Sequence, residues 1–144
     1  MYSSFLGSNL LSSSGKLATE TALSAPVIAL YFSAHWCSPC RAFTPLLSKY
    51  YKEWNKTQKE IEIIFISSDK DESSFSEYFK EMPWLALPFE ERKIKDQLSK
   101  KYEVPGIPTL VVVSKNGEGL NLQADEDVKG DEAIVLAKFK ALYK

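Results

Sequence analysis

Three apolar runs constrain the fold of this chain more than any other feature of its sequence. They occupy residues 27–33, 61–67 and 109–114, and polar residues are rare within them. A strand with one exposed face alternates apolar and polar residues, whereas a strand buried on both faces is apolar nearly throughout. The runs therefore predict the inner strands of a sheet that is covered on both sides.

Helical patterns separate these runs, so the expected fold class is α/β, with helices on each side of a central sheet. The clearest pattern is an apolar stripe at three- and four-residue spacing after Cys40, which predicts a long helix. The stripe consists of Phe43, Leu46, Leu47, Tyr50, Tyr51 and Trp54. The other expected elements are helices at 73–80, 91–102 and 131–143, a short strand at 85–89, an N-terminal hairpin over 9–18, and a second hairpin that turns at 115–117 into 120–123.

Length and composition limit the classes of function. With 144 residues and 44% hydrophobic residues, we expect one domain, residues 1–144, with a full core. A net charge of −1 argues against a nucleic-acid partner, which favours a basic face. No apolar run reaches the roughly 18 residues of a membrane helix. The serine-rich start lacks a basic segment and is unlike a secretion signal, so we expect a cytoplasmic location, with the nucleus as an alternative.

The chain contains only two cysteines, Cys37 and Cys40, in the segment Trp-Cys-Ser-Pro-Cys between the first apolar run and the long helix. This position places the first sulfur at a helix N-terminus, where free N–H groups and the helix dipole favour a thiolate. The second sulfur lies one turn further on, close enough to form a disulfide. The pair predicts thiol–disulfide exchange, in which Cys37 attacks and Cys40 resolves the mixed disulfide. Such chemistry needs no cofactor, because the two sulfurs carry the electrons.

Two structural explanations of the cysteines are weaker. A structural zinc site needs four ligands, usually Cys or His, and the chain offers two Cys and one His, so no metal is expected. A purely structural disulfide across two residues would close a very short loop and constrain the unfolded chain little.

The neighbours of the cysteines suggest further roles. Trp36 is expected to flank the sulfur as a contact surface, although a core position is the alternative. Pro39 favours extended geometry at Ser38 and helps to define the helix start. His35 lies two residues before Cys37 and is a weaker candidate for proton transfer.

A second motif, Ile107-Pro108, directly precedes the third apolar run. Taken alone, it is a plain boundary between a loop and a strand. Together with the cysteine motif, it gives an arrangement that resembles the thioredoxin superfamily, in which a cis proline packs against the active-site disulfide. The resemblance implies that the Ile107 backbone pairs with a bound substrate segment and that Pro108 shapes the groove.

Most of the chain resembles the tryparedoxin and nucleoredoxin branch of that superfamily. The most specific stretch is Met-Pro-Trp-Leu-Ala-Leu-Pro-Phe at residues 82–89, joined to Trp-Cys-x-Pro-Cys at 36–40. Other matching segments lie at 5–7, 9–11, 31–34, 43–45, 75–79, 101–102 and 106–110. The resemblance implies a thioredoxin-like fold, with a central mixed β-sheet flanked by helices and an N-terminal β-hairpin. It also implies a substrate surface formed by Trp36, Ser38, Pro39, Ile107 and Pro108.

Several departures distinguish this chain within the branch. Ser38 stands where the branch usually carries proline, and Ser67-Ser68-Asp69 stands where tryparedoxins carry a tryptophan. Asp125 stands at the aligned position of an arginine that often faces the active site. These changes weaken the case for trypanothione as the reductant, although acidic residues could still attract a cationic polyamine.

The resemblance also bears on proton transfer. Many thioredoxins bury an acidic residue and a lysine on adjacent strands, and Tyr31 and Phe65 occupy those positions here. The Tyr31 hydroxyl or an ordered water is therefore expected to take the proton from Cys40.

The expected function is that of a monomeric protein-disulfide reductase. It would take electrons from a low-molecular-weight dithiol or a reductase and pass them to protein disulfides such as oxidised peroxiredoxins. Trypanothione, glutathione and thioredoxin reductase all remain open as the donor. The alternative is a redox-dependent adaptor of nucleoredoxin type with little turnover. A peroxidase is a weaker reading, because no second cysteine environment of the peroxiredoxin type is present.

Overall fold

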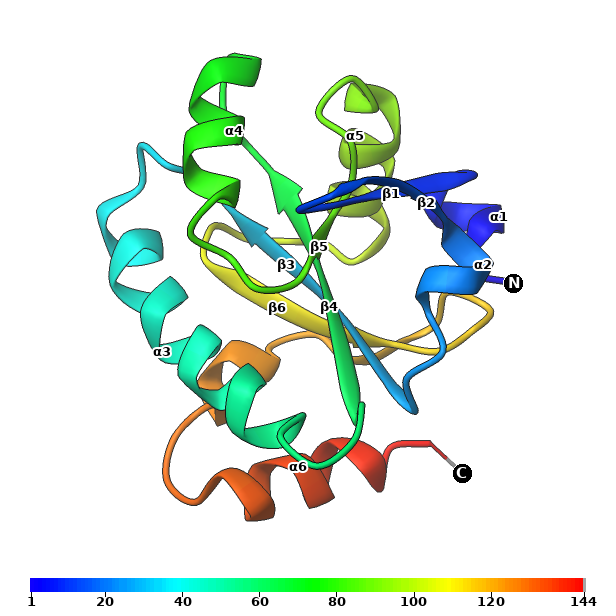
Figure 1. The fold of residues 1–144 in the computed structure, drawn as a ribbon, viewed down its shortest axis with the longest axis vertical. Helices are drawn as coiled ribbons and strands as arrows, with labels where there is room; N and C mark the ends of the chain where they lie inside the picture. Colours follow the sequence, from blue (N-terminus) through cyan, green and yellow to red (C-terminus); the bar gives the residue numbers. More distant parts are fainter. Residues whose placement is uncertain (144) are drawn as a thin grey trace.

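A seven-stranded mixed sheet forms the centre of the structure, a computed structural model that describes residues 1–143 (Figure 1). The strand order is β2-β1-β5-β4-β3-β6-β7. β3 pairs in parallel with β4 and β4 with β5, whereas β6 is antiparallel to β3. The three apolar runs are thus inner strands, as predicted. The strands are β1 (Asn9–Ser12), β2 (Gly15–Ala18), β3 (Val27–Ser33), β4 (Ile61–Ser67), β5 (Leu85–Ala86), β6 (Thr109–Val113) and β7 (Gly119–Asn121).

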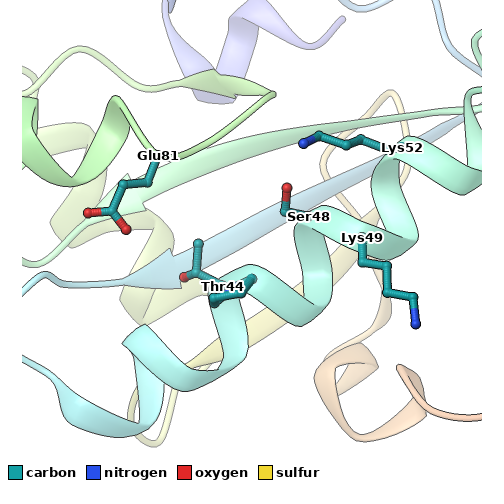
Figure 2. A pocket seen from close by; sticks show the side chains of 6 residues that line it. Thr44, Ser48, Lys49, Lys52 and Glu81 are labelled. Carbon is teal, nitrogen blue, oxygen red and sulfur yellow. The ribbon is translucent and has the colours of Figure 1, made fainter.

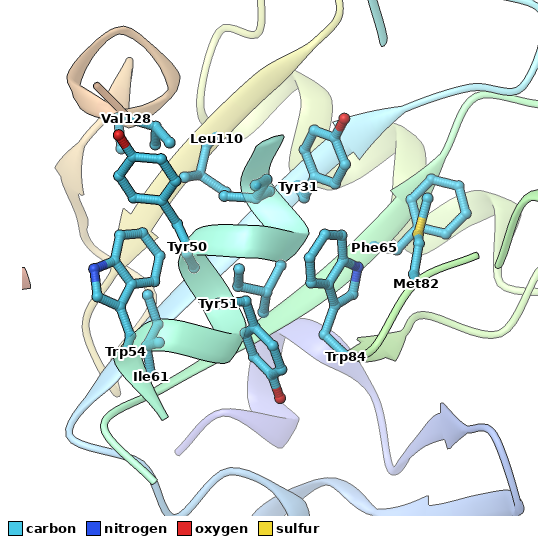
Figure 3. Packing of buried hydrophobic residues seen from close by; sticks show 14 of the residues in the cluster. Tyr31, Tyr50, Tyr51, Trp54, Ile61, Phe65, Met82, Trp84, Leu110 and Val128 are labelled. Atoms are coloured by element: carbon cyan, nitrogen blue, oxygen red, sulfur yellow. The ribbon is translucent and has the colours of Figure 1, made fainter. Parts of the chain in front are cut away.

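Helices cover both faces of the sheet because alternate strand residues point to opposite sides. Ala29 and Tyr31 of β3 join a core formed with α3, α4 and α6, part of which Figure 3 shows. Ile28 and Leu30 join a second core with α1 and α5. This arrangement confirms the predicted α/β class. The helices are α1 (Ser3–Leu6), α2 (Thr19–Ala22), α3 (Ser38–Trp54), α4 (Glu72–Phe79), α5 (Arg92–Lys101), α6 (Glu132–Lys140) and the 3-10 helix η1 (Ala124–Asp127). Over residues 1–143, none of the helices has the length and apolar character needed to cross a bilayer.

The structure corrects several of the predicted elements. The helix expected at 131–143 spans Glu132–Lys140, and the strand expected at 120–123 spans Gly119–Asn121. The strand expected at 85–89 spans only Leu85–Ala86. Leu87 still donates a backbone hydrogen bond to Phe65, but Pro88 has no N–H to continue the ladder. The four-residue elements α1, α2 and η1 were not predicted, because a stretch of four residues is too short to show a hydrophobic period. Leu46, expected in the apolar stripe of α3, is 39% exposed.

The topology brings the two sequence motifs to the same edge of the sheet. The antiparallel register of β3 and β6 pairs Phe32 with Thr109. The residues that follow the end of β3 therefore lie beside those that precede β6. The first group contains the cysteine motif and the second contains Ile107-Pro108, so motifs that lie 70 positions apart in the chain meet in one site.

Candidate active site

Cys37 is the N-cap residue of α3. Its Sγ accepts a hydrogen bond from the backbone N–H of Cys40 at 3.3 Å, so the sulfur lies where the N-terminal N–H groups of the helix are directed. The thiol also donates to the carbonyl oxygen of Ile107 at 3.8 Å. The residue is only 6% exposed, and Ile107 packs against it.

Cys40 lies one turn further along α3 and is completely buried. Both cysteines are free thiols. Burial raises the pKa of the Cys40 thiol to about 11, and the hydrogen bond with Cys37 adds to the rise. The nearby Ser33 hydroxyl and the backbone of Ala34 act in the opposite direction and lower this pKa. Cys40 is therefore protonated at neutral pH, as the sequence indicated.

The loop that carries Cys37 is bonded to the loop that follows β4. The backbone N–H of His35 donates to Oδ1 of the buried Asp69 at 2.8 Å, and the Ser67 hydroxyl donates to Oδ2 at 2.8 Å. The indole Nε1 of Trp36 donates to the carbonyl oxygen of Ser68 at 3.0 Å. Because Trp36 is 57% exposed beside Cys37, its position supports the contact-surface reading over a core role.

The remaining predicted substrate residues surround the same sulfur. The Ile107–Pro108 peptide bond is cis, as the resemblance implied, and both side chains are half-buried. Ser38 and Pro39 are exposed in the first turn of α3. The structure therefore places these residues with Trp36 around Cys37, and their part in substrate binding stays a prediction.

A shallow depression lies beside the cis proline, lined by residues 105–109, Gln123, Asp125 and Glu126. Asp125 thus lies near the redox site, as its alignment indicated. Its Oδ1 accepts a hydrogen bond from the backbone N–H of Leu110 at 3.0 Å. This carboxylate therefore also fixes η1 to the start of β6, a structural role that the sequence did not suggest.

A cluster of hydroxyl groups beneath Cys40 was not predicted as a whole. Tyr31 and Phe65 are register partners on β3 and β4, so a phenol and a phenyl ring stand where many thioredoxins carry an acid and a lysine. The Tyr31 hydroxyl lies 3.4 Å from the carbonyl oxygen of Cys40. The sequence offered one signal: Ser33 is a polar residue in an apolar run, two positions after Tyr31 and on the same face of the strand.

The cluster draws its four hydroxyls from three elements. Ser33 Oγ lies 2.8 Å from Tyr78 Oη, Tyr78 Oη lies 2.5 Å from Thr44 Oγ1, and Thr44 Oγ1 lies 2.7 Å from Tyr31 Oη. Burial raises the pKa of Tyr31 and of Tyr78, so both phenols stay protonated at neutral pH. The His35 ring stacks on the Tyr78 ring with 5.4 Å between centroids, so Tyr78 separates the imidazole from Thr44 and Tyr31.

A second depression lies between α3 and the segment that follows α4 (Figure 2). Its charged groups are the exposed side chains of Lys49, Lys52 and Glu81. In Figure 2, Lys49 points away from the side of the helix that carries Ser48 and Lys52. These groups do not converge on a common point, so the candidate active site is the one around Cys37.

Comparisons with known proteins identify the family and the fold. A protein-family model described as thioredoxin-like matches residues 26–119. Nucleoredoxin from Mus musculus is 41% identical over 123 residues, which are 85% of this chain and 28% of that protein. The chain thus spans just over a quarter of this relative. Tryparedoxin from Trypanosoma brucei brucei is 44% identical over 106 residues, which are 74% of this chain and 72% of that protein.

A solved structure of tryparedoxin II in complex with glutathionylspermidine has a similar fold. It superimposes with a TM-score of 0.77 at 39% identity and covers 84% of both chains. The thioredoxin-like fold implied by the sequence motifs is therefore confirmed.

Proposed function

We propose, from the premise that this chain belongs to the thioredoxin-like family, that it reduces protein disulfides through Cys37 and Cys40. It is a thioredoxin-superfamily oxidoreductase related to nucleoredoxin and tryparedoxin. The observation that carries the proposal is the contact between the Cys37 sulfur and the N–H of Cys40 at the start of α3. This contact places the attacking sulfur at the N-terminus of α3, while burial keeps Cys40 as a thiol.

The reaction proceeds in two exchange steps. The Cys37 thiolate attacks one sulfur of the substrate disulfide, forms a mixed disulfide, and releases the other substrate sulfur as a thiolate that takes up a proton. Cys40 then loses its proton and attacks Cys37 Sγ, which releases the second substrate thiol. The substrate gains two electrons, and the protein is left with a Cys37–Cys40 disulfide.

The substrate surface consists of Trp36, Ser38, Pro39, Ile107 and Pro108. A substrate segment would lie along the cis-proline loop and pair with the Ile107 backbone, while the exposed Trp36 indole covers its apolar side. We propose peroxiredoxin-type disulfides as targets. A low-molecular-weight dithiol or a reductase would restore the dithiol, and the glutathionylspermidine bound to tryparedoxin II favours a small thiol. The protein would act as a monomeric single domain, residues 1–144, in the cytoplasm.

A redox-dependent adaptor is the second candidate, and one observation favours it. The Cys37 side chain is only 6% exposed, so a large partner has little access to the sulfur unless the Ile107 side moves. In that case the cysteines would control an interaction and turn over slowly.

Reduction of insulin separates the two candidates. The rate is measured with trypanothione, glutathione or thioredoxin reductase as the electron donor in parallel reactions, with the Cys37→Ser protein as the blank. Turnover with one donor supports the reductase and identifies its donor. Rates equal to the blank with all three donors contradict the reductase and favour the adaptor.

A further inference from the structure

The hydrogen bonds between β3 and β4 continue past the ends of the two strands. The parallel register ends with Ser33 opposite Ser67, and the backbone N–H of Ser68 then donates to the carbonyl oxygen of Ser33 at 2.9 Å. The bonds of a parallel ladder are evenly spaced and alternate in direction between the strands. The next bond of this ladder would therefore run from the N–H of His35 to the carbonyl oxygen of Ser68.

Asp69 takes the N–H that this next ladder bond would use. Its Oδ1 accepts from the backbone N–H of His35 at 2.8 Å. The carbonyl oxygen of Ser68 accepts instead from the indole Nε1 of Trp36 at 3.0 Å. A side chain of the cysteine loop is thus bound where a backbone bond would otherwise lie, and the loop is held at two successive residues.

The fold fixes the Asp69 carboxylate in place. The residue is 4% exposed, its Oδ2 accepts from the Ser67 hydroxyl at 2.8 Å, and Ser67 Oγ accepts from the Asp69 backbone N–H at 2.9 Å. Nη1 of Arg92 donates to the carbonyl oxygen of Ser67 at 2.8 Å, which brings a cation to the same turn. A buried carboxylate needs such partners. The acceptor for His35 is therefore in position before any substrate binds.

The loop held by Asp69 carries the attacking cysteine. The backbone N–H of Cys37 donates to the carbonyl oxygen of Ala34 at 3.2 Å, which closes a turn with His35 and Trp36 at its two central positions. The Trp36 residue is 57% exposed, so core packing does little to hold its ring and the bond to Ser68 matters more. A contact ring that is already ordered spares a substrate the free-energy cost of ordering it on binding.

We propose that Asp69 is a positioning residue of the redox site. By accepting the His35 N–H, it leaves the Ser68 carbonyl to the Trp36 indole and so holds this ring beside Cys37 for protein substrates. Asp69 acts through Trp36 and does not itself touch the substrate. The kinetic consequence rests on the proposed reduction of protein disulfides, whereas the position of the ring can be measured without any reaction.

The direct test follows the indole N–H of Trp36 by nuclear magnetic resonance. Asp69→Ala removes the acceptor, so the His35 N–H turns to the Ser68 carbonyl and competes with the indole there. The Trp36 Nε1–H should then exchange with solvent about fivefold faster, the factor that corresponds to one typical hydrogen bond. Its signal is identified by its loss in Trp36→Phe. Asp69→Asn keeps a carbonyl oxygen as acceptor and should restore slow exchange.

Asp71→Ala is the matched control. Asp71 lies two positions further along the same loop, and its Oδ1 accepts from the backbone N–H of Ser74 at 2.7 Å as the N-cap of α4. Loss of this cap should lower the melting temperature. It should leave the exchange of the Trp36 indole unchanged, because Asp71 makes no bond to the cysteine loop. Equal acceleration in Asp71→Ala and Asp69→Ala would show a general loosening of the region and contradict the proposal.

Reduction kinetics give the functional readout. With dithiothreitol as the electron donor, Asp69→Ala should raise KM for insulin about two- to tenfold and leave kcat unchanged, because only the ordering of the ring on binding is affected. Oxidation of the reduced protein by 2-hydroxyethyl disulfide should keep its rate, since this small disulfide has no need of the ring. In a Trp36→Phe background, Asp69→Ala should raise KM no further.

The outcomes separate this inference from the proposed function. Unchanged indole exchange in Asp69→Ala overturns the inference, whatever the activity of the protein. Equal losses of rate with insulin and with 2-hydroxyethyl disulfide also contradict it, because the effect then lies on Cys37 itself.

Two further results are informative. If Asp69→Ala does not fold, the unmodified protein is measured instead: its Trp36 indole N–H should exchange at least about tenfold slower than in the unfolded chain, and equal rates overturn the inference. If the unmodified protein fails to reduce insulin but Asp69→Ala accelerates the indole exchange as expected, the proposed function fails and the assignment of Asp69 stands.

Discussion

At the scale of single residues, Cys37 and Cys40 have different environments although only two residues separate them. The N-cap position of Cys37 gives its sulfur an N–H donor, whereas the Cys40 sulfur is enclosed by the core. The attacking sulfur and the resolving sulfur thus lie one helical turn apart. Replacing one should therefore have a different effect on the reaction from replacing the other.

Replacement of each cysteine by serine should separate the two exchange steps. Cys37→Ser should abolish disulfide reduction, because no other thiolate reaches the substrate. Cys40→Ser should accumulate protein joined to its substrate through Cys37, because the resolving sulfur is missing. Non-reducing electrophoresis measures both results. An active Cys37→Ser protein would contradict the assignment of the attacking sulfur.

The raised pKa of Cys40 predicts a stability difference between the two redox forms in alkali. The pKa of the Cys40 thiol is 9.0, its usual value, in the unfolded chain and about 11 in the folded protein. Between these values the unfolded chain loses its proton first, so the folded state of the reduced protein becomes less stable as pH rises. The loss should be about 1 to 3 kcal/mol.

Denaturant unfolding at a series of pH values measures this effect. The oxidised protein is the control, because its sulfurs do not titrate while its buried tyrosines, such as Tyr102 and Tyr143, do. If the free energy of unfolding falls equally with rising pH in the reduced and the oxidised protein, Cys40 does not titrate as described.

The sequence predicted the cysteines of this site and missed most of the hydroxyls for a physical reason. Only two residues separate Cys37 from Cys40 in the chain, so their spacing already defines their geometry. Ser33, Thr44 and Tyr78 come from β3, α3 and α4, and only tertiary packing brings their oxygen atoms within hydrogen-bond distance. Serine, threonine and tyrosine at such positions are common, so no local pattern singles them out.

At the scale of elements, α3 serves both the site and the core. Its first turn holds the cysteines, and its inner face packs against the sheet through residues such as Leu47, which is fully buried. The neighbouring Leu46 points outward and is 39% exposed. The two leucines therefore form a matched pair for measuring how strongly the helix is held.

Leu47→Ala should destabilise the protein by about 2 to 5 kcal/mol, because it removes buried methyl groups and leaves a cavity. Leu46→Ala should cost clearly less, since 39% of Leu46 stays exposed to solvent and its removal leaves no enclosed cavity. Urea unfolding of both variants gives the two values. Similar losses for both would mean that α3 packs with a different face inward.

Long elements were predicted more accurately than short ones, and the ends that depend on partners elsewhere in the chain were predicted worst. Val27–Ser33 and Ile61–Ser67 were predicted with their observed bounds, because strands buried on both faces carry a long apolar signal. β5 is shorter than predicted because Pro88 ends its ladder, and η1 is held by a side chain of Asp125 that bonds to β6. Such ends depend on partners that are distant in sequence, so periodicity does not reveal them.

At the scale of the whole molecule, the sheet is unequally protected. β3 lies between β4 and β6 and is buried over its full length, whereas every residue of the edge strand β2 is exposed. β2 contacts the sheet only through β1, and β1 pairs with β5 at a single position, Leu11 with Ala86. The hairpin is thus the least supported part of the sheet.

Amide hydrogen exchange should reflect this order. Amides of β3 and β4 should exchange only through global unfolding, while those of β2 should exchange through local opening of the hairpin. Exchange followed by nuclear magnetic resonance in mild denaturant distinguishes the two routes. Equal protection in β2 and β3 would show that the hairpin and the central strands unfold as one unit.

The exposed indole of Trp36 should report the redox state of this protein through its fluorescence. Trp54 and Trp84 are enclosed by the core, whereas Trp36 is adjacent to Cys37 and largely open to solvent. A disulfide next to an excited indole quenches its fluorescence, and a dithiol does so less. The emission of Trp36 should therefore brighten when Cys37 and Cys40 are reduced, while the two buried indoles supply a constant background. Each turnover carries its own optical signal, with no added label.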